Sequence, residues 1–104
     1  MICKNLSVSE DNHLLFACQD TVALAKQYGT PLYLMDEERI RENCRTYLTA
    51  VKETFGDRGK VLFASKAASF KRIYEIMKEE GMCTDVVSSG EIYTANKAGF
   101  PLEN

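Results

Sequence analysis

Apolar, strand-like runs alternate with helix-like segments along most of this 104-residue chain. The runs 32–35, 61–64 and 84–88 are each followed by a stretch whose apolar residues recur at helical spacing. Such alternation predicts parallel βα units joined by right-handed crossovers. Three units cannot close a barrel of the (β/α)8 type, which needs eight. We therefore expect an α/β fold, either a partial (β/α)8 barrel at the N-terminal part of a longer protein or an open three-stranded sandwich.

Capping residues set the limits of the predicted helices. Asp20 and Asp36 are preferred N-cap residues for the first two helices, and Ser69 is a fair N-cap for the third. The run Ser88 to Glu91 has the S-x-x-E spacing of a capping box, which predicts the start of a fourth helix. Before the first helix, Leu14 to Cys18 predicts a single strand with no partner nearby. We expect an N-terminal segment, residues 1–19, followed by the barrel part, residues 20–104.

A lysine follows the second apolar run directly. Four consecutive apolar positions, Val61 to Ala64, predict a strand buried on both faces, and Lys66 lies just beyond it among small residues. Burial disfavours the charged form of a lysine, and the free amine is a nucleophile suited to Schiff-base chemistry with a carbonyl cofactor. The alternative is a strand that ends at a solvated lysine, which is the common state of this residue type.

Two acidic residues accompany the third apolar run. In parallel α/β folds the ligand site lies at the carboxyl ends of the strands, and Asp85 and Glu91 flank that end of the run. Asp85 lies in an apolar stretch and therefore requires a hydrogen-bond donor, for which Lys66 is available. Glu91 is explained equally as the acidic half of the capping box.

Charge and composition exclude several classes of partner. The formal net charge is −2 and no basic run is present, which argues against nucleic acid and anionic membranes as partners. No stretch approaches the roughly 20 apolar residues of a spanning helix, and no signal peptide is visible, so we expect a cytosolic protein. The four cysteines lack metal-ligand spacing and the chain has one histidine, so we expect no metal site and predict small buried thiols.

Five short motifs occur in order along the chain. They are Tyr28-Gly29-Thr30-Pro31-Leu32-Tyr33, Phe63-Ala64-Ser65-Lys66-Ala67, Glu80-Gly81, Asp85-Val86-Val87-Ser88-Ser89-Gly90-Glu91-Ile92-Tyr93 and Ala98-Gly99-Phe100-Pro101, and the resemblance that they carry runs from about Val22 to the end. Together they resemble the N-terminal part of the diaminopimelate decarboxylase family, which belongs to the alanine racemase-like, fold-type III class of pyridoxal-phosphate enzymes. Ala68 and Ser89 depart from the residues that many members of this family carry there.

The resemblance implies a partial TIM barrel of the pyridoxal-phosphate-binding type. It implies that Lys66 forms the Schiff base with pyridoxal 5′-phosphate and that Ala64, Asp85 and Glu91 lie around the cofactor. The implied reaction is the decarboxylation of the amino acid meso-2,6-diaminopimelate to L-lysine, in lysine biosynthesis. It also implies a homodimer, an N-terminal segment associated with a C-terminal β-domain, and no activity from this part alone.

Two other functions remain open at this level. A related pyridoxal-phosphate decarboxylase, acting on ornithine, arginine or carboxynorspermidine, keeps the same fold and cofactor. A non-catalytic α/β module binding a phosphorylated ligand or a partner subunit through an open sheet edge keeps only the fold.

Overall fold

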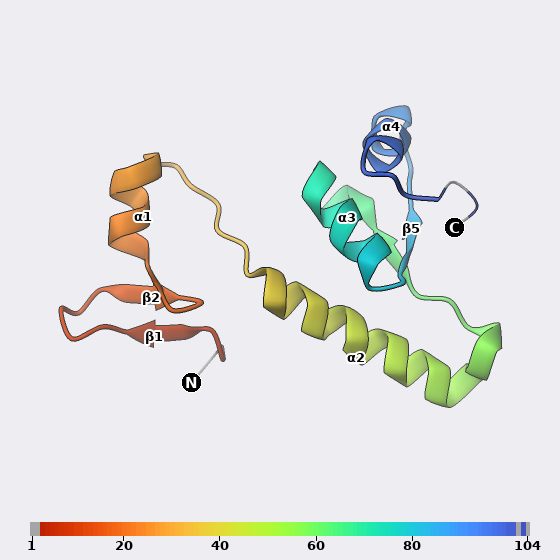
Figure 1. Ribbon diagram of the computed structural model, residues 1–104, viewed down its shortest axis with the longest axis horizontal. Coiled ribbons are helices and arrows are strands. Elements are labelled where there is room, and N and C mark those ends of the chain that lie inside the picture. The colour runs from red at the N-terminus through yellow and green to blue at the C-terminus, as the bar shows by residue number, and fades with distance from the viewer. Residues whose placement is uncertain (1–2, 102, 104) are drawn as a thin grey trace. The chain divides into compact units, whose positions relative to one another are not determined.

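A computed structural model describes residues 3–101 and residue 103 of the chain (Figure 1). The described residues form two compact units, one ending at Arg39 and the other beginning at Ile40. The boundary falls in the first turn of helix α2 (Glu37–Phe55).

The first unit contains an antiparallel sheet in which β2 (Leu14–Phe16) lies between two partners. It pairs with β1 (Leu6–Val8) on one side and with β3 (Gln19–Asp20) on the other. The prediction of a strand without a nearby partner is therefore wrong. The missed partners are only two or three residues long, and neither forms an apolar run. A turn with Asn12 at φ 59° returns the chain from β1 to β2.

Polar contacts fix helix α1 (Thr21–Tyr28) to this sheet. Asp20 caps the helix as predicted, because its Oδ1 accepts hydrogen bonds from the backbone N–H groups of Val22 and Ala23 at 2.8 and 3.2 Å. Its other oxygen lies 2.8 Å from Nδ1 of His13, in the turn before β2. The Thr21 hydroxyl also donates to the backbone oxygen of Leu14 in β2 at 2.8 Å. No residue of α1 is buried, so polar bonds of this kind are the specific links between the helix and the sheet.

The predicted strand at residues 32–35 is not formed. The segment is irregular, and the side chains of Leu32, Tyr33 and Met35 are exposed. A strand requires a neighbour for its backbone N–H and C=O groups, and the described residues of this unit place none beside the segment. Asp36, directly after it, accepts a hydrogen bond from the backbone N–H of Arg39 and so caps α2 as predicted.

The second unit contains two strand–helix repeats after α2. They are β4 (Leu62–Ala64) with α3 (Lys71–Glu79) and β5 (Cys83–Asp85) with α4 (Ser89–Lys97). The strands pair in parallel, as predicted, with Leu62 opposite Cys83 and Ala64 opposite Asp85. Short 3-10 turns, η1 (Gly56–Arg58) and η2 (Ser65–Ala67), precede and follow β4. Two of the three predicted βα units are therefore formed.

The core covers one face of the strand pair. Phe63 packs against the core from β4, whereas Leu62 is 54% exposed and Ala64 is also exposed on the other face. The prediction that this strand is buried on both faces is wrong for the described residues, because helices cover only one of the two faces. The buried core residues are Cys44, Ile73, Tyr74, Met77, Met82, Ala95, Ala98 and Phe100.

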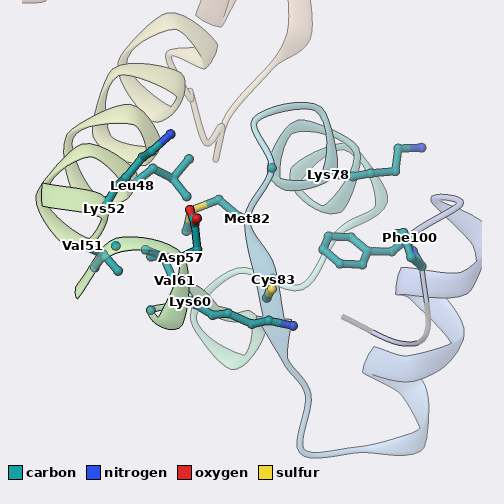
Figure 2. Close-up of a pocket in the computed structure, with 14 residues that line it drawn as sticks. Leu48, Val51, Lys52, Asp57, Lys60, Val61, Lys78, Met82, Cys83 and Phe100 are labelled. Carbon is teal, nitrogen blue, oxygen red and sulfur yellow. The ribbon is translucent and has the colours of Figure 1, made fainter. Parts of the chain in front are cut away.

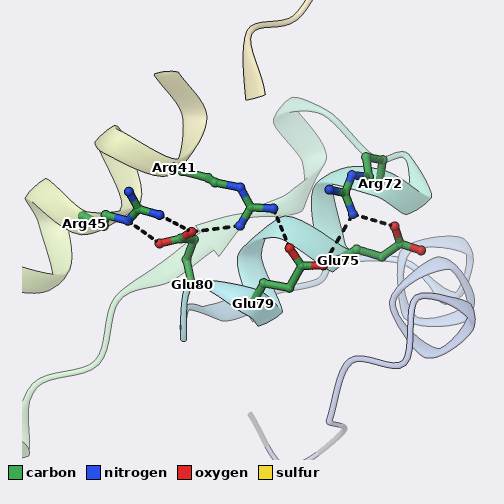
Figure 3. A network of polar contacts seen from close by, with 6 residues as sticks. All are labelled: Arg41, Arg45, Arg72, Glu75, Glu79 and Glu80. Carbon is green, nitrogen blue, oxygen red and sulfur yellow. Dashed lines mark hydrogen bonds and ion pairs between the residues drawn. The ribbon is translucent and has the colours of Figure 1, made fainter. Parts of the chain in front are cut away.

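Charged side chains join the surfaces of α2 and α3 (Figure 3). Arg41 of α2 donates to Glu79 and Glu80, and Arg45 donates to both oxygens of Glu80 at 2.8 and 2.9 Å. Hydrogen bonds from Arg41 hold the pKa of Glu79 below its ordinary value, and those from Arg45 and Arg41 do the same for Glu80. These contacts add polar links between the two helices at the protein surface, beside their apolar packing.

The two later capping predictions have opposite outcomes. Ser88 and Glu91 form the capping box of α4. The N-cap position of α3 is Phe70 without a side-chain cap, so the prediction of Ser69 at that position is wrong. The Ser69 hydroxyl lies 3.0 Å from the Tyr74 hydroxyl instead.

The cysteines divide between the core and the surface. Cys44 is buried, as predicted, with its thiol 3.5 Å from the Met77 sulfur, and burial raises its pKa. The prediction of buried thiols is wrong for Cys3 and Cys18, which are exposed. Across the described residues, no helix combines the length and apolar character needed to cross a membrane.

Candidate functional site

The carboxyl ends of β4 and β5 bring the predicted site residues to one region. Ala64 and Asp85 are register partners and are both exposed, on the face away from the core. Lys66 lies two residues beyond Ala64, in turn η2, and is also exposed. The structure therefore places Ala64 and Asp85 side by side, with Lys66 directly after them.

Among the described residues, neither charged group at these strand ends has a side-chain partner. Within the described parts of the chain, the Lys66 amine and the Asp85 carboxylate make no hydrogen bond or ion pair. The predicted burial of Lys66 is wrong here, and so is the expectation that Asp85 lies among apolar groups and requires Lys66 as a donor. Both errors have one cause, since the face of the strand pair that carries these residues is uncovered. The Lys66 amine is accessible from solvent on this face.

Glu91 is placed differently from the other candidates. Its side chain is 8% exposed, and Oε2 accepts hydrogen bonds from the backbone N–H groups of Val87 and Ser88 at 2.6 and 3.1 Å. The Ser88 hydroxyl in turn accepts from the backbone N–H of Glu91 at 3.2 Å. The Glu91 carboxylate thus holds the loop between β5 and α4. This loop begins directly after Asp85.

A cleft of about 430 Å³ lies at the opposite end of the strands (Figure 2). Lys60 and Val61 line it before β4, and Met82 lines it before β5. Lys52 and Lys78 reach its rim from the last turns of α2 and α3, where positive charge complements the helix dipole. Because Lys66 and Asp85 lie at the carboxyl ends, this cleft is separate from the candidate site.

A family model supports the chemistry suggested by the lysine. The model for the pyridoxal-dependent decarboxylases, pyridoxal binding domain, matches residues 37–104, which include Lys66, Asp85 and Glu91. The chain belongs to this family. Among proteins of known function, diaminopimelate decarboxylase of Bacillus methanolicus is 45% identical over 91% of this chain and 22% of its own length. The same enzyme of Methanothermobacter thermautotrophicus is 46% identical over 92% of this chain and 22% of its length.

Solved structures agree with this membership in the decarboxylase family. The crystal structure of diaminopimelate decarboxylase from M. jannaschii matches with a TM-score of 0.82 and 30% identity, over 93% of this chain and 23% of the other. A co-complex of that protein with L-lysine matches with a TM-score of 0.76 and 29% identity. These matches confirm the α/β class and the partial barrel of the pyridoxal-binding type. The chain spans about a fifth of the length of the relatives it matches.

The residues present fit a pyridoxal group at this place in a decarboxylase domain. A Schiff base forms between a lysine amine and a carbonyl cofactor, and the cofactor requires space beside that amine. Lys66 provides an accessible amine, and the small exposed side chain of Ala64 leaves space on the open face. The Asp85 carboxylate, at the end of the neighbouring strand, would stabilise positive charge on the bound group.

Sequence reasoning missed two hydroxyl groups that form hydrogen bonds near the two ends of the segment that carries the lysine. Ser65 was assigned only as a small neighbour, yet its Oγ is fully buried and donates to the backbone oxygen of Asp85 at 2.8 Å. The hydroxyl of Tyr74, a fully buried residue of α3, contacts the hydroxyl of Ser69. The available signal was a hydroxyl residue inside an otherwise apolar strand end, since a buried hydroxyl requires a partner.

Proposed function

We propose that this chain provides the cofactor-bearing lysine of a diaminopimelate decarboxylase. In this proposal Lys66 holds pyridoxal 5′-phosphate, and the substrate is the amino acid meso-2,6-diaminopimelate, which loses CO₂ to give L-lysine. The observation that carries the proposal is the position of Lys66 at the carboxyl end of β4, with an amine free of partners beside the strand end of Asp85. The relatives that bear this name are 45 and 46% identical over nine-tenths of the chain.

Each candidate residue has a role in this proposal. When bound, pyridoxal phosphate supplies an electron sink for the electron pair that is left behind as CO₂ leaves. A proton then replaces the carboxylate on the same carbon. Lys66 holds the group, Ala64 leaves room for its ring, and the Asp85 carboxylate stabilises positive charge beside the amine. Glu91 acts through the loop after β5, because its carboxylate is bonded to that loop.

We also propose that the working protein is a homodimer in the cytoplasm, without nucleic acid or membrane as a partner. The resemblance to the decarboxylase family supports the dimer, and the small net charge of −2 argues against a polyanionic partner. Light scattering of the full-length protein tests the dimer. A monomeric mass in solutions that retain activity would exclude it.

Covalent labelling tests the assignment of Lys66. The full-length protein is mixed with pyridoxal phosphate, its visible absorbance is recorded, borohydride is added, and the labelled peptide is identified by mass spectrometry. We expect the label on Lys66 and none on Lys60, which lies at the opposite end of the same strand. Lys66→Ala is expected to abolish the absorbance, whereas Lys60→Ala leaves it unchanged. A label on another lysine would overturn the assignment.

A substrate panel tests the reaction. Release of CO₂ is measured from the full-length protein with meso-2,6-diaminopimelate, ornithine, arginine and carboxynorspermidine as separate substrates. We expect kcat/KM to be largest for diaminopimelate. Preference for another amino acid would keep the cofactor assignment and replace the substrate. Cofactor binding without release of CO₂ from any of the four would support a non-catalytic module.

A further inference from the structure

Lys66 lies in a short segment, residues 65–70, that connects β4 to α3. The segment contains one 3-10 turn and then extended chain, and both Lys66 and Ala67 in it are exposed. Its regular structure is too short to hold a flexible lysine by itself. The position of the amine therefore depends on how the two ends of the segment are fixed.

Ser65 fixes the first end to the neighbouring strand. Its side chain has no exposed surface, and its Oγ donates to the backbone oxygen of Asp85 at 2.8 Å. A reciprocal contact lies one residue back, where Oγ1 of Thr84 donates to the backbone oxygen of Phe63 at 3.2 Å. The Thr84 bond joins two residues that are paired in the sheet, and the Ser65 bond extends the connection between β4 and β5 one residue beyond the last pair, Ala64 and Asp85. The Ser65 bond thus joins the residue before Lys66 directly to Asp85.

Tyr74 fixes the second end to the core. Its side chain has no exposed surface, and its hydroxyl lies 3.0 Å from Oγ of Ser69. Packing alone would be satisfied by a phenylalanine, so the hydroxyl adds a specific link from the core to the segment. Ala68, between Lys66 and Ser69, also packs against the core. The segment is thus held on both sides of the exposed lysine.

We infer that Ser65 and Tyr74 are positioning residues for the Lys66 amine. The Ser65 bond sets the lysine relative to the Asp85 strand end, and the Tyr74 bond prevents the segment from moving away from the core. Neither hydroxyl touches the amine, so both act through the backbone. The inference rests on the proposed attachment of pyridoxal phosphate to Lys66, and it adds the groups that hold this lysine in place.

Hydroxyl deletions in the full-length protein test the inference. Ser65→Ala and Tyr74→Phe each remove one oxygen and keep the remaining shape. We expect each to lower the equilibrium constant for covalent attachment of pyridoxal phosphate by roughly five- to tenfold, because one hydrogen bond and the alignment of the amine are lost. The visible absorbance of the attached cofactor, titrated with pyridoxal phosphate at several pH values, gives this constant.

Two controls separate positioning from general loss of stability. Ile76→Val removes one methylene from a buried residue on the same helix as Tyr74, and Thr54→Ala removes an exposed hydroxyl that donates to the backbone of α2. Thermal unfolding is measured for all variants. We expect Ile76→Val to lower the melting temperature without changing the attachment constant, and Thr54→Ala to leave both unchanged.

A second readout uses the protein before cofactor is added. Acetic anhydride at trace concentration acetylates accessible amines in their unprotonated form, and mass spectrometry compares its rate at Lys66 with that at Lys60 at one fixed pH. Both hydroxyl variants are expected to keep this ratio within a factor of about two, since the amine is already exposed.

The outcomes distinguish the inference from the proposed function. Wild-type attachment constants in both Ser65→Ala and Tyr74→Phe would overturn the inference and leave Lys66 as the attachment site. An equal loss in Ile76→Val would also overturn it, because the effect would then follow stability alone. Failure of the wild-type protein to attach pyridoxal phosphate at Lys66 would overturn the proposed function itself.

Discussion

The two units are stabilised by different kinds of contact. The second unit buries apolar side chains such as Ile73, Tyr74 and Met77 in one core. In the first unit no residue of α1 is buried, and specific polar bonds hold the chain, among them the Asp20 cap and a 2.9 Å bond from Asn5 to Asp36. Burial of apolar area is the dominant favourable term in folding, whereas polar bonds exchange with water for little net gain. We therefore expect the second unit to be the more stable.

The largest expected effect is the loss of a core side chain. Ile73→Ala removes a residue that is 5% exposed and leaves a cavity, so we expect a loss of about 2–5 kcal/mol in the free energy of unfolding. In the first unit, Val8 on β1 is 66% exposed, and Val8→Ala is expected to change the free energy by less than about 0.5 kcal/mol. Urea denaturation followed by circular dichroism measures both. Equal losses of unfolding free energy in the two variants would contradict the expectation that apolar burial stabilises the second unit more than the first.

A matched pair of glycines gives a smaller effect in each unit. Gly29 and Gly81 follow α1 and α3 with φ of 82° and 80°, and a Cβ at either site would meet no atom within 4 Å. The cost of Gly→Ala is therefore conformational, about 1–3 kcal/mol at each site, and Gly29 with ψ of 178° lies in a region that is essentially restricted to glycine. We expect Gly81→Ala to lower the stability of the whole second unit, and Gly29→Ala to affect only α1.

Amide hydrogen exchange separates these two results. Gly29→Ala is expected to speed exchange at the α1 amides and leave those of α3 unchanged. Gly81→Ala is expected to speed exchange at the most protected core amides, such as that of Met77. If Gly29→Ala altered core exchange as strongly, the two units would unfold together.

The difference between a unit held by apolar burial and a unit held by polar bonds also explains which elements the sequence predicts correctly. Helical periodicity identified α2, α3 and α4, because burial of one face leaves a regular apolar pattern, and capping signals also marked the starts of α2 and α4. Strands β1 and β3 were missed, since strands of two or three residues held by backbone bonds leave no such pattern. The bond between His13 and Asp20 joins two polar residues whose pairing no local spacing specifies.

The candidate site was predicted only in part for a related reason. Lys66 and Asp85 were found because they follow apolar runs in a βα pattern, which places them at one edge of a parallel sheet. Their exposure was not predicted, since a run of four apolar residues does not specify how many faces are covered. The hydroxyl bonds of Ser65 and Tyr74 depend on tertiary contacts, and a sequence without coordinates does not give their partners.

The ion pairs between α2 and α3 are expected to stabilise the second unit in a pH-dependent way. Hydrogen bonds from Arg45 and Arg41 hold the pKa of Glu80 below its ordinary value of 4.5. The unfolded state therefore binds the proton more readily, so the stabilisation is present above pH 4.5 and is lost as the pH falls through the folded-state pKa. We expect Glu80→Gln to lower the urea midpoint at pH 7, and the difference from wild type to shrink in acid.

Glu53→Gln is the control for this measurement, because it removes an exposed carboxylate on α2 without these partners. Its midpoint is expected to follow that of the wild-type protein across the whole pH range. If the urea midpoints of Glu80→Gln and wild type differed by the same amount down to acid pH, the loss of stability would come from the changed shape of the side chain and not from its charge.

The smallest expected effect concerns the cap of α1, where one carboxylate has two tasks. Asp20→Asn keeps an oxygen for the N–H groups of Val22 and Ala23 and removes the charge beside His13, whereas Asp20→Ala removes both. The bond with His13 holds the pKa of Asp20 below its ordinary value of 3.8, so its contribution is lost only as the pH falls below that value. Exchange at the Val22 and Ala23 amides near pH 7 is expected to rise severalfold in Asp20→Ala and little in Asp20→Asn. If the two variants exchanged equally fast, the His13 contact rather than the cap would be the interaction that orders the first unit.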